Sequence, residues 1–101
     1  MTFSGGGYED VARWLKNFLT SHAKRAHPRV EVALDAGGER EGRSYAVRLR
    51  FGDRWSAPVE FDYKEVADNR GTLQWCRAAA DRIQALAREL AAPGLTGTGG
   101  R

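Results

Sequence analysis

SYAVRLRF, residues 44–51, is the stretch that decides the fold of this 101-residue chain. Apolar and polar side chains alternate along it, and in an extended chain successive side chains point to opposite faces. One face carries Tyr45, Val47, Leu49 and Phe51, and the other carries Ala46, Arg48 and Arg50. This pattern predicts a strand with one face on an apolar core and the other face exposed.

The segments on both sides repeat this alternation. Residues 29–35 and 55–63 place apolar side chains at every second position: Val30, Val32 and Leu34 in the first, and Trp55, Ala57, Val59, Phe61 and Tyr63 in the second. The connections are short and contain glycine, which favours hairpins between successive strands. We therefore predict an antiparallel meander with 44–51 in the middle. Pro58 lacks the N–H that a central strand needs, so 55–63 should be an edge strand.

Two further segments have the periodicity of amphipathic helices. Residues 8–27 carry a stripe with a spacing of three or four, made of Val11, Trp14, Leu15, Phe18, Leu19 and His22, and Pro28 ends this helix. Residues 72–92 begin with Thr72, a residue type that caps helices. Their stripe is made of Leu73, Cys76, Ala80, Ile83, Leu86 or Ala87, and Leu90. Residues 64–71 fit either a turn or a short helical turn.

These elements predict a two-layer α+β fold. Two helices would pack on one face of a three-stranded antiparallel sheet, in the order α-β-β-β-α. Residues 8–92 are enough for a single domain with one core. The glycine-rich ends, residues 1–7 and 93–101, are expected to be flexible tails.

Composition limits the environment and the partners of the chain. It carries 16 Lys and Arg against 13 Asp and Glu, and this net charge of +3 is too small to imply nucleic acid by itself. No segment has the length of a membrane span or the pattern of a secretory signal. The single cysteine, Cys76, can form neither an internal disulfide nor a cysteine-based zinc site. We therefore expect a cytoplasmic protein without membrane contact.

Charges of both signs alternate across the predicted outer face of the sheet. Arg48 and Arg50 lie on the middle strand, between Glu31 and Asp35 on one neighbour and Glu60 and Asp62 on the other. Directly opposed opposite charges attract, so we predict a salt-bridge ladder that neutralises this face. The alternative is a phosphate or carboxylate site on the two arginines. A platform on which RNA bases stack is disfavoured, because the aromatic side chains of these strands point to the other face.

The sequence offers only weak candidates for chemistry. His22 and Cys76 lie on the two helical stripes, but a thiol–imidazole pair would also need a third, orienting residue. His22 and His27 do not share a helical face, as two metal ligands would. Gly5-Gly6-Gly7 lacks the lysine and the hydroxyl residue of a phosphate-binding loop. We therefore predict a packed histidine, a buried structural cysteine, and no catalytic residue, metal site or cofactor.

The last helix offers the first of two candidate binding surfaces. Trp75 is accompanied there by Arg70, Arg77 and Arg82, and tryptophan and arginine are enriched at binding hot spots. Seven alanines between residues 78 and 92 would let a second helix approach closely. We therefore expect a non-enzymatic interaction module whose partner is another protein or a second copy of itself. Alternatively, Trp75 packs under residues 64–71 and the alanines only fit the helix against the sheet.

The first helix offers the second candidate, a basic surface for nucleic acid or phosphate. Its members are Arg13, Lys16, Lys24, Arg25 and Arg29, and no acid lies between residues 11 and 30. Basic side chains on one face can hold phosphates. The alternative is that the cations near the helix end only complement the helix dipole.

The order helix–strand–strand–strand–helix over most of residues 8–92 is similar to that of the double-stranded RNA-binding domain. This resemblance implies RNA contacts on the first helix, where Arg13, Lys16 and Lys24 would make them. Two other contact elements of that family differ here. The first loop reads AGGEREGR without a histidine, and the last helix begins RGTLQWCRAAA without a lysine cluster. Nucleic acid is therefore the alternative to a protein partner.

Overall fold

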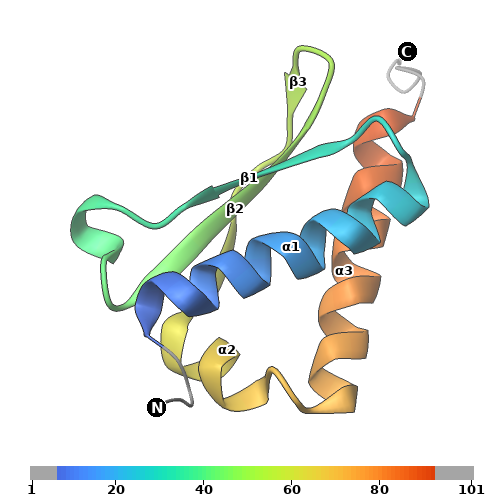
Figure 1. Cartoon of the computed structure of the whole chain (residues 1–101). Helices are drawn as coiled ribbons and strands as arrows, with labels where there is room; N and C mark the ends of the chain where they lie inside the picture. The colour runs from blue at the N-terminus through green and yellow to red at the C-terminus, as the bar shows by residue number, and fades with distance from the viewer. Residues whose placement is uncertain (1–6, 93–101) are drawn as a thin grey trace.

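The computed structural model describes residues 7–92, and Figure 1 shows their arrangement. The elements are α1 (Tyr8–Ala26), β1 (Glu31–Asp35), the 3-10 turn η1 (Gly38–Arg40), β2 (Ser44–Phe51), β3 (Arg54–Trp55), β4 (Val59–Asp62), α2 (Tyr63–Asn69) and α3 (Leu73–Ala91). Within this range the predicted α+β class is confirmed, but the sheet has a fourth strand and α2 is an additional helix. The predicted tails, residues 1–7 and 93–101, lie outside the described residues except for Gly7.

β2 is the central strand of the sheet, as its pattern predicts. It pairs antiparallel with β1 along one side, where Val32 lies opposite Leu49, and with both β3 and β4 along the other side. The segment around Pro58 joins β3 to β4 and therefore lies at an edge, as predicted.

The predicted strand 55–63 is interrupted, and the interruption changes the direction of Trp55. β4 pairs Val59 with Val47, whereas β3 pairs Trp55 with Arg50. Between these pairs β2 advances by three residues and the opposing chain by four, so the edge contains one extra residue, a β-bulge. A shift of one residue moves a side chain to the opposite face. The prediction that Trp55 and Ala57 face the core is therefore wrong, and Trp55 is 49% exposed on the outer face.

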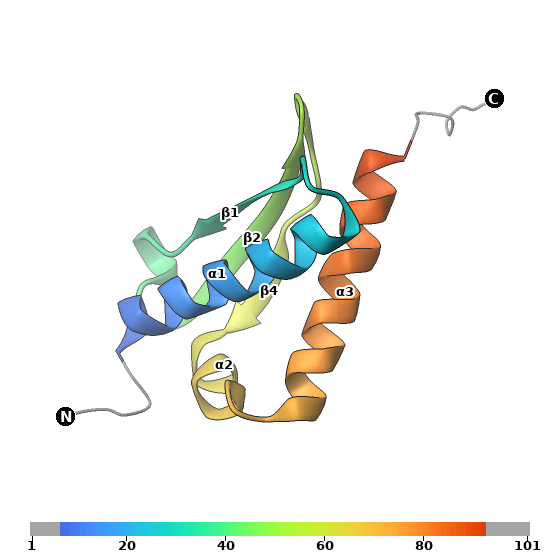
Figure 2. The same ribbon diagram turned by 45° about the vertical axis from the view of Figure 1, so that its right-hand side comes forward.

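The two long helices cover the inner face of the sheet (Figures 1 and 2). α1 runs alongside β1 and packs against it, whereas α3 packs against β2 and crosses α1 at a steep angle. Fully buried side chains come from all three parts: Val11, Leu15 and Leu19 from α1, Ile83 and Ala87 from α3, and Tyr45, Val47 and Leu49 from β2. The predicted two-layer packing is confirmed, and Arg48 and Arg50 are exposed on the opposite face of the sheet.

α2 begins where Asp62 caps it. The Asp62 carboxylate accepts a hydrogen bond of 3.0 Å from the N–H of Glu65, and this satisfies a donor that the first helical turn leaves without a partner. Tyr63 therefore begins a helix and does not end a strand as predicted. Of the two alternatives for residues 64–71, the short helix is correct.

The first turn of α3 extends beyond the core. Thr72 occupies the predicted cap position, without a hydrogen bond from its side chain. Leu73 is 71% exposed, so its predicted place in the buried stripe is wrong. The buried residues of α3 begin only at Ala79, because the sheet does not reach the first turn.

Candidate interaction surfaces

Trp75 packs under α2, which was one of the two alternatives for this residue. Its indole N–H donates a hydrogen bond of 2.8 Å to a carboxylate oxygen of Glu65. Its ring stands edge-on to Phe61 at 6.3 Å and lies 6.4 Å from the ring of Trp14. With both its polar and its apolar parts engaged inside the chain, Trp75 mainly joins α3 to α2 and α1.

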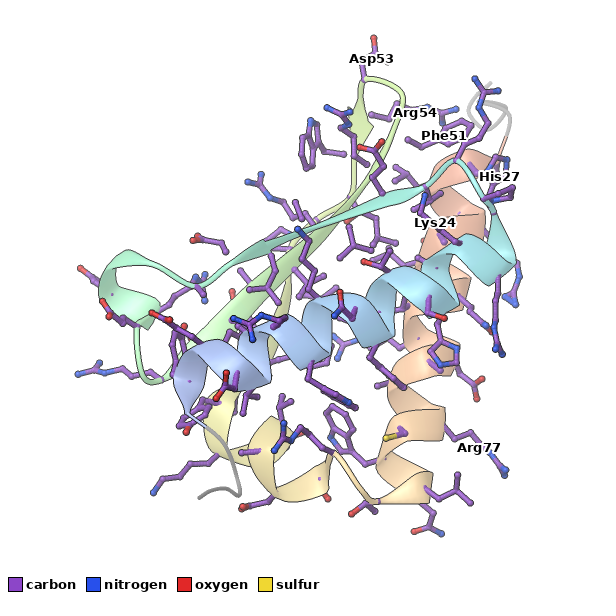
Figure 3. All side chains as sticks on the ribbon, viewed as in Figure 1. Lys24, His27, Phe51, Asp53, Arg54 and Arg77 are labelled. Atoms are coloured by element: carbon purple, nitrogen blue, oxygen red, sulfur yellow. The ribbon has the colours of Figure 1, made fainter. Side chains whose placement is uncertain are left out.

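The structure divides the four residues predicted on the last helix among different places. Arg82 lines a hollow of about 290 Å³ together with Trp75. Arg77 lies on the other side of α3 and points away from the body of the molecule (Figure 3). Arg70 follows α2, and its carbonyl accepts a hydrogen bond from the Cys76 thiol. These four side chains therefore do not form one continuous surface.

A groove of about 390 Å³ runs between α1 and α3, and we call it the α1–α3 groove. Phe18 and Ala80 contribute apolar walls from the two helices, and the exposed Leu73 lies beside them. Arg77 and Asp81 line the same groove and introduce charges of both signs.

His22 and Cys76 both line the α1–α3 groove, but no hydrogen bond between them is present in the described residues. The single proton of the Cys76 thiol is shared between the carbonyls of Arg70, at 3.3 Å from the sulfur, and Asn69, at 3.9 Å. The His22 ring lies 4.6 Å from the ring of Phe18, and its Nδ1 is buried without a partner among residues 7–92. The sulfur therefore serves as a donor to the end of α2, and the imidazole is left with an unsatisfied nitrogen.

Only one rung of the predicted salt-bridge ladder forms on the outer face. Arg50 pairs with Glu31 at 3.0 Å. Asp35 and Glu60 instead contact Arg40 of η1, at 3.8 Å for Asp35 and through two hydrogen bonds for Glu60. The hydrogen bond with Glu60 raises the pKa of the Arg40 guanidinium, which stays charged. The remaining acid of the ladder is the cap of α2, so the prediction of a complete ladder is wrong.

Arg48 and Arg50 lie against the exposed tryptophan of the outer face. The guanidinium carbon of Arg48 is 5.2 Å from the centre of the Trp55 ring, and that of Arg50 is 5.7 Å from it. Both distances are within the range of cation–π attraction. We call these three residues the Trp55 cluster. The cluster does not follow from the sequence pattern, because strict alternation places Trp55 inside. The only warning in the sequence is Pro58, which disrupts regular pairing.

The five cations predicted on the first helix are all exposed, but they point in different directions. Arg13 pairs with Asp10 at 3.5 Å, and the Lys24 ammonium donates to the Pro28 carbonyl at 3.1 Å. Arg25 lines the α1–α3 groove, and Arg29 lines a hollow beside β1 and β2. Only Arg13, Lys16 and Lys24 share the solvent side of α1, given the 3.6-residue period of a helix.

The end of the β2–β3 hairpin is occupied by internal contacts. His27 stands edge-on to Phe51 at 4.8 Å, and Arg54 lies over the same ring at 5.7 Å (Figure 3). The Arg54 guanidinium also donates to the Ala92 carbonyl at 3.3 Å. Arg54 therefore joins the hairpin to the end of α3 and is not part of the Trp55 cluster.

The comparisons with known proteins leave these surfaces without a precedent. No protein-family model matches the chain, and no curated protein or solved structure matches it either. Among residues 7–92, no helix combines the length and the apolar character that a membrane span needs. The same residues contain no group of three or more His, Cys, Asp or Glu side chains placed to hold a metal ion.

Proposed function

We propose that this protein is a small, cytoplasmic, non-enzymatic interaction module that pairs with a second copy of itself through the α1–α3 groove. The observation that carries the proposal is Leu73, which is 71% exposed and lines a groove with both apolar and charged walls. A single exposed leucine is ordinary on a protein surface. A leucine that adjoins a groove formed by two helices is typical of an interface between helices.

The charges of the groove suit a second copy of the chain. Arg77 and Asp81 are one helical turn apart on α3, and within residues 7–92 neither forms an ion pair. In a dimer with two-fold symmetry, antiparallel α3 helices would place Arg77 of each copy opposite Asp81 of the other. The contact would therefore be complementary to itself.

Measurement of molar mass across a dilution series tests this proposal. We expect the wild-type chain to change from dimer to monomer on dilution and Leu73→Ser to shift that transition to higher concentration by at least about tenfold, the loss of about 1.4 kcal/mol. Trp55→Ser removes the other large hydrophobic side chain that is exposed within residues 7–92, on the opposite face, and should leave the transition unchanged.

The charge pair provides a stricter test. Arg77→Asp and Asp81→Arg should each weaken the dimer, and the double variant should restore it because each arginine again meets an aspartate. A wild-type chain that is monomeric at every concentration would refute self-association. Failure of the double variant to restore the dimer would refute the proposed pairing.

Nucleic-acid binding through α1 is the second candidate, and it is supported by the exposure of Arg13, Lys16 and Lys24 on one side of the helix. If Arg13, Lys16 and Lys24 each contact one phosphate, the log–log slope of duplex RNA affinity against salt should be about −3, and not the −4 to −5 expected for all five predicted cations. Titration with duplex RNA at two salt concentrations tests this candidate. Affinity that is insensitive to salt would exclude it.

A further inference from the structure

We propose that the Trp55 cluster on the outer face of the sheet is a binding site for single-stranded nucleic acid, independent of self-association. In this site a base stacks on Trp55 and the adjacent phosphates bind Arg48 and Arg50. The inference rests on an exposed aromatic ring beside two guanidinium groups. This is the combination by which proteins bind single strands without reading their sequence.

The register of the sheet fixes the geometry of this site. Trp55 lies directly opposite Arg50, and Arg50 lies opposite Glu31, so the three residues form one row across β3, β2 and β1. The residue Trp55 is 49% exposed even with both guanidinium groups over its ring. Part of the indole therefore remains accessible to an incoming base.

Arg48 is the cation of the Trp55 cluster that no acid among the described residues neutralises. The residue opposite it on β1 is Ala33, and the nearest acids of the outer face have other roles. Asp35 and Glu60 contact Arg40, and Asp62 caps α2. Within residues 7–92 Arg48 forms no salt bridge, so its charge is available for a phosphate.

A second cationic position continues the site along the sheet. A hollow of about 400 Å³ beside the cluster is lined by Arg29 and Arg50, with Phe51 and Gly52. Glu31 also lines it but is paired with Arg50. Arg29 therefore offers a third cation to the phosphates of a single-stranded nucleic acid that extends from Trp55 toward this hollow.

The chemistry favours a single strand over a duplex or a protein. The bases of a duplex are stacked inside the helix, whereas an unpaired base exposes its face to an aromatic ring. A protein partner would need a broader apolar patch, but the neighbours of Trp55 on this face are the charged side chains of Arg48 and Arg50, and the residue beyond Arg48 on β1 is the small Ala33. A flexible anionic chain with unpaired bases fits one ring among arginines best.

Fluorescence anisotropy of a labelled oligo-uridine, measured with the full chain at several salt concentrations, tests the proposal. Trp55→Ala should weaken binding by about 5- to 150-fold, the range found for the loss of one stacked base, and Trp55→Phe should restore most of the affinity. Arg48→Gln should weaken binding and reduce the magnitude of the log–log salt slope by about 0.7, the value for one phosphate contact on a single strand.

Matched variants separate this site from the other surfaces. Lys16→Gln removes one exposed charge from α1 on the opposite side of the molecule and should leave binding unchanged, as should Leu73→Ser in the α1–α3 groove. Unlabelled duplex RNA should compete poorly. Thermal unfolding followed by circular dichroism should show that all these surface variants remain folded.

Three results would overturn the proposal. The first is no binding of the oligonucleotide at low salt. The second is equal affinity of the wild type and Trp55→Ala. The third is a pattern in which Lys16→Gln weakens binding, Arg48→Gln does not, and the duplex competes well. That pattern would assign nucleic-acid binding to α1.

Discussion

Tyr45 shows at the scale of one residue how a polar group is accommodated in this core. Its side chain is fully buried, its ring stacks on Tyr8 at 4.7 Å, and its hydroxyl donates to the Tyr8 carbonyl at 2.8 Å. The single proton of the Tyr8 hydroxyl is shared in turn between the carbonyls of Ala36 and Ser44. Burial, and then the neighbouring tyrosines Tyr8 and Tyr63, raise the pKa of Tyr45 above its ordinary value of 10.0. Burial also raises the pKa of Tyr8.

These tyrosines should make the protein sensitive to alkali. The unfolded chain releases the phenolic proton near the ordinary pKa, whereas the folded chain retains it at higher pH. The free energy of unfolding should therefore be unaffected by Tyr45 below about pH 10 and should fall as the pH rises above that value. Tyr45→Phe removes the hydrogen bond and should lower the free energy of unfolding by about 0.5–1.5 kcal/mol at neutral pH. The stability of this variant should, however, fall less steeply in alkali than that of the wild type. Urea denaturation across this pH range measures both effects. If the stabilities of the wild type and Tyr45→Phe fell equally with rising pH, Tyr45 would not be the source of the alkali sensitivity.

The bulge between β3 and β4 is the decisive feature at the scale of elements. Ser56 stabilises it with two bonds to Leu49: its N–H donates to the Leu49 carbonyl, and its hydroxyl accepts from the Leu49 N–H, both at 2.9 Å. The hydroxyl thus replaces the main-chain acceptor that regular pairing would provide. Leu49 is fully buried, so water is a poor substitute for this acceptor.

Ser56→Ala should therefore destabilise the fold by about 1–3 kcal/mol, because the Leu49 N–H would lose its acceptor. Ser56→Thr keeps a hydroxyl at the same position and should destabilise the fold less than Ser56→Ala. Urea denaturation measures the difference. A cost for Ser56→Ala within about 0.5 kcal/mol, the level of an ordinary surface substitution, would mean that the hydroxyl does not support the bulge.

At the scale of the whole molecule, one core joins every layer. The core side chains of α1, α3 and the sheet form a single cluster that also includes Val66 of α2. A single small domain of this kind usually unfolds in one cooperative step. Its stability therefore depends on a few large buried side chains, among them Ile83 of α3.

Ile83→Ala should lower the free energy of unfolding by about 2–5 kcal/mol, a large share of the total for a small domain. Leu73→Ala, in the same helix but exposed, should change it by less than about 0.5 kcal/mol when measured at concentrations at which the chain is monomeric. Denaturation curves from circular dichroism and from tryptophan fluorescence should coincide for the wild type. An equal loss of unfolding free energy in Ile83→Ala and Leu73→Ala would contradict a single cooperative core. Circular dichroism and fluorescence curves that do not coincide for the wild type would contradict it as well.

Local periodicity was sufficient to predict α1, β1, β2, α3, the antiparallel meander and the two-layer class. Such patterns follow from the geometry of one element, in which side chains recur every two or every 3.6 residues. The three exposed cations of α1 were predictable for the same reason. The strand order followed from short connections, since neighbouring segments pair most readily with each other.

The direction of Trp55, the exposure of Leu73 and the partners of the acids on the sheet were not predictable in this way. Each depends on a contact between distant parts of the chain: the bulge opposite β2, the reach of the sheet beneath α3, and the position of Arg40 between Asp35 and Glu60. A pattern along one segment carries no information on such pairings. The outer face was therefore predicted as a neutral ladder, while in the folded chain a one-residue offset exposes an aromatic ring there, beside two arginines.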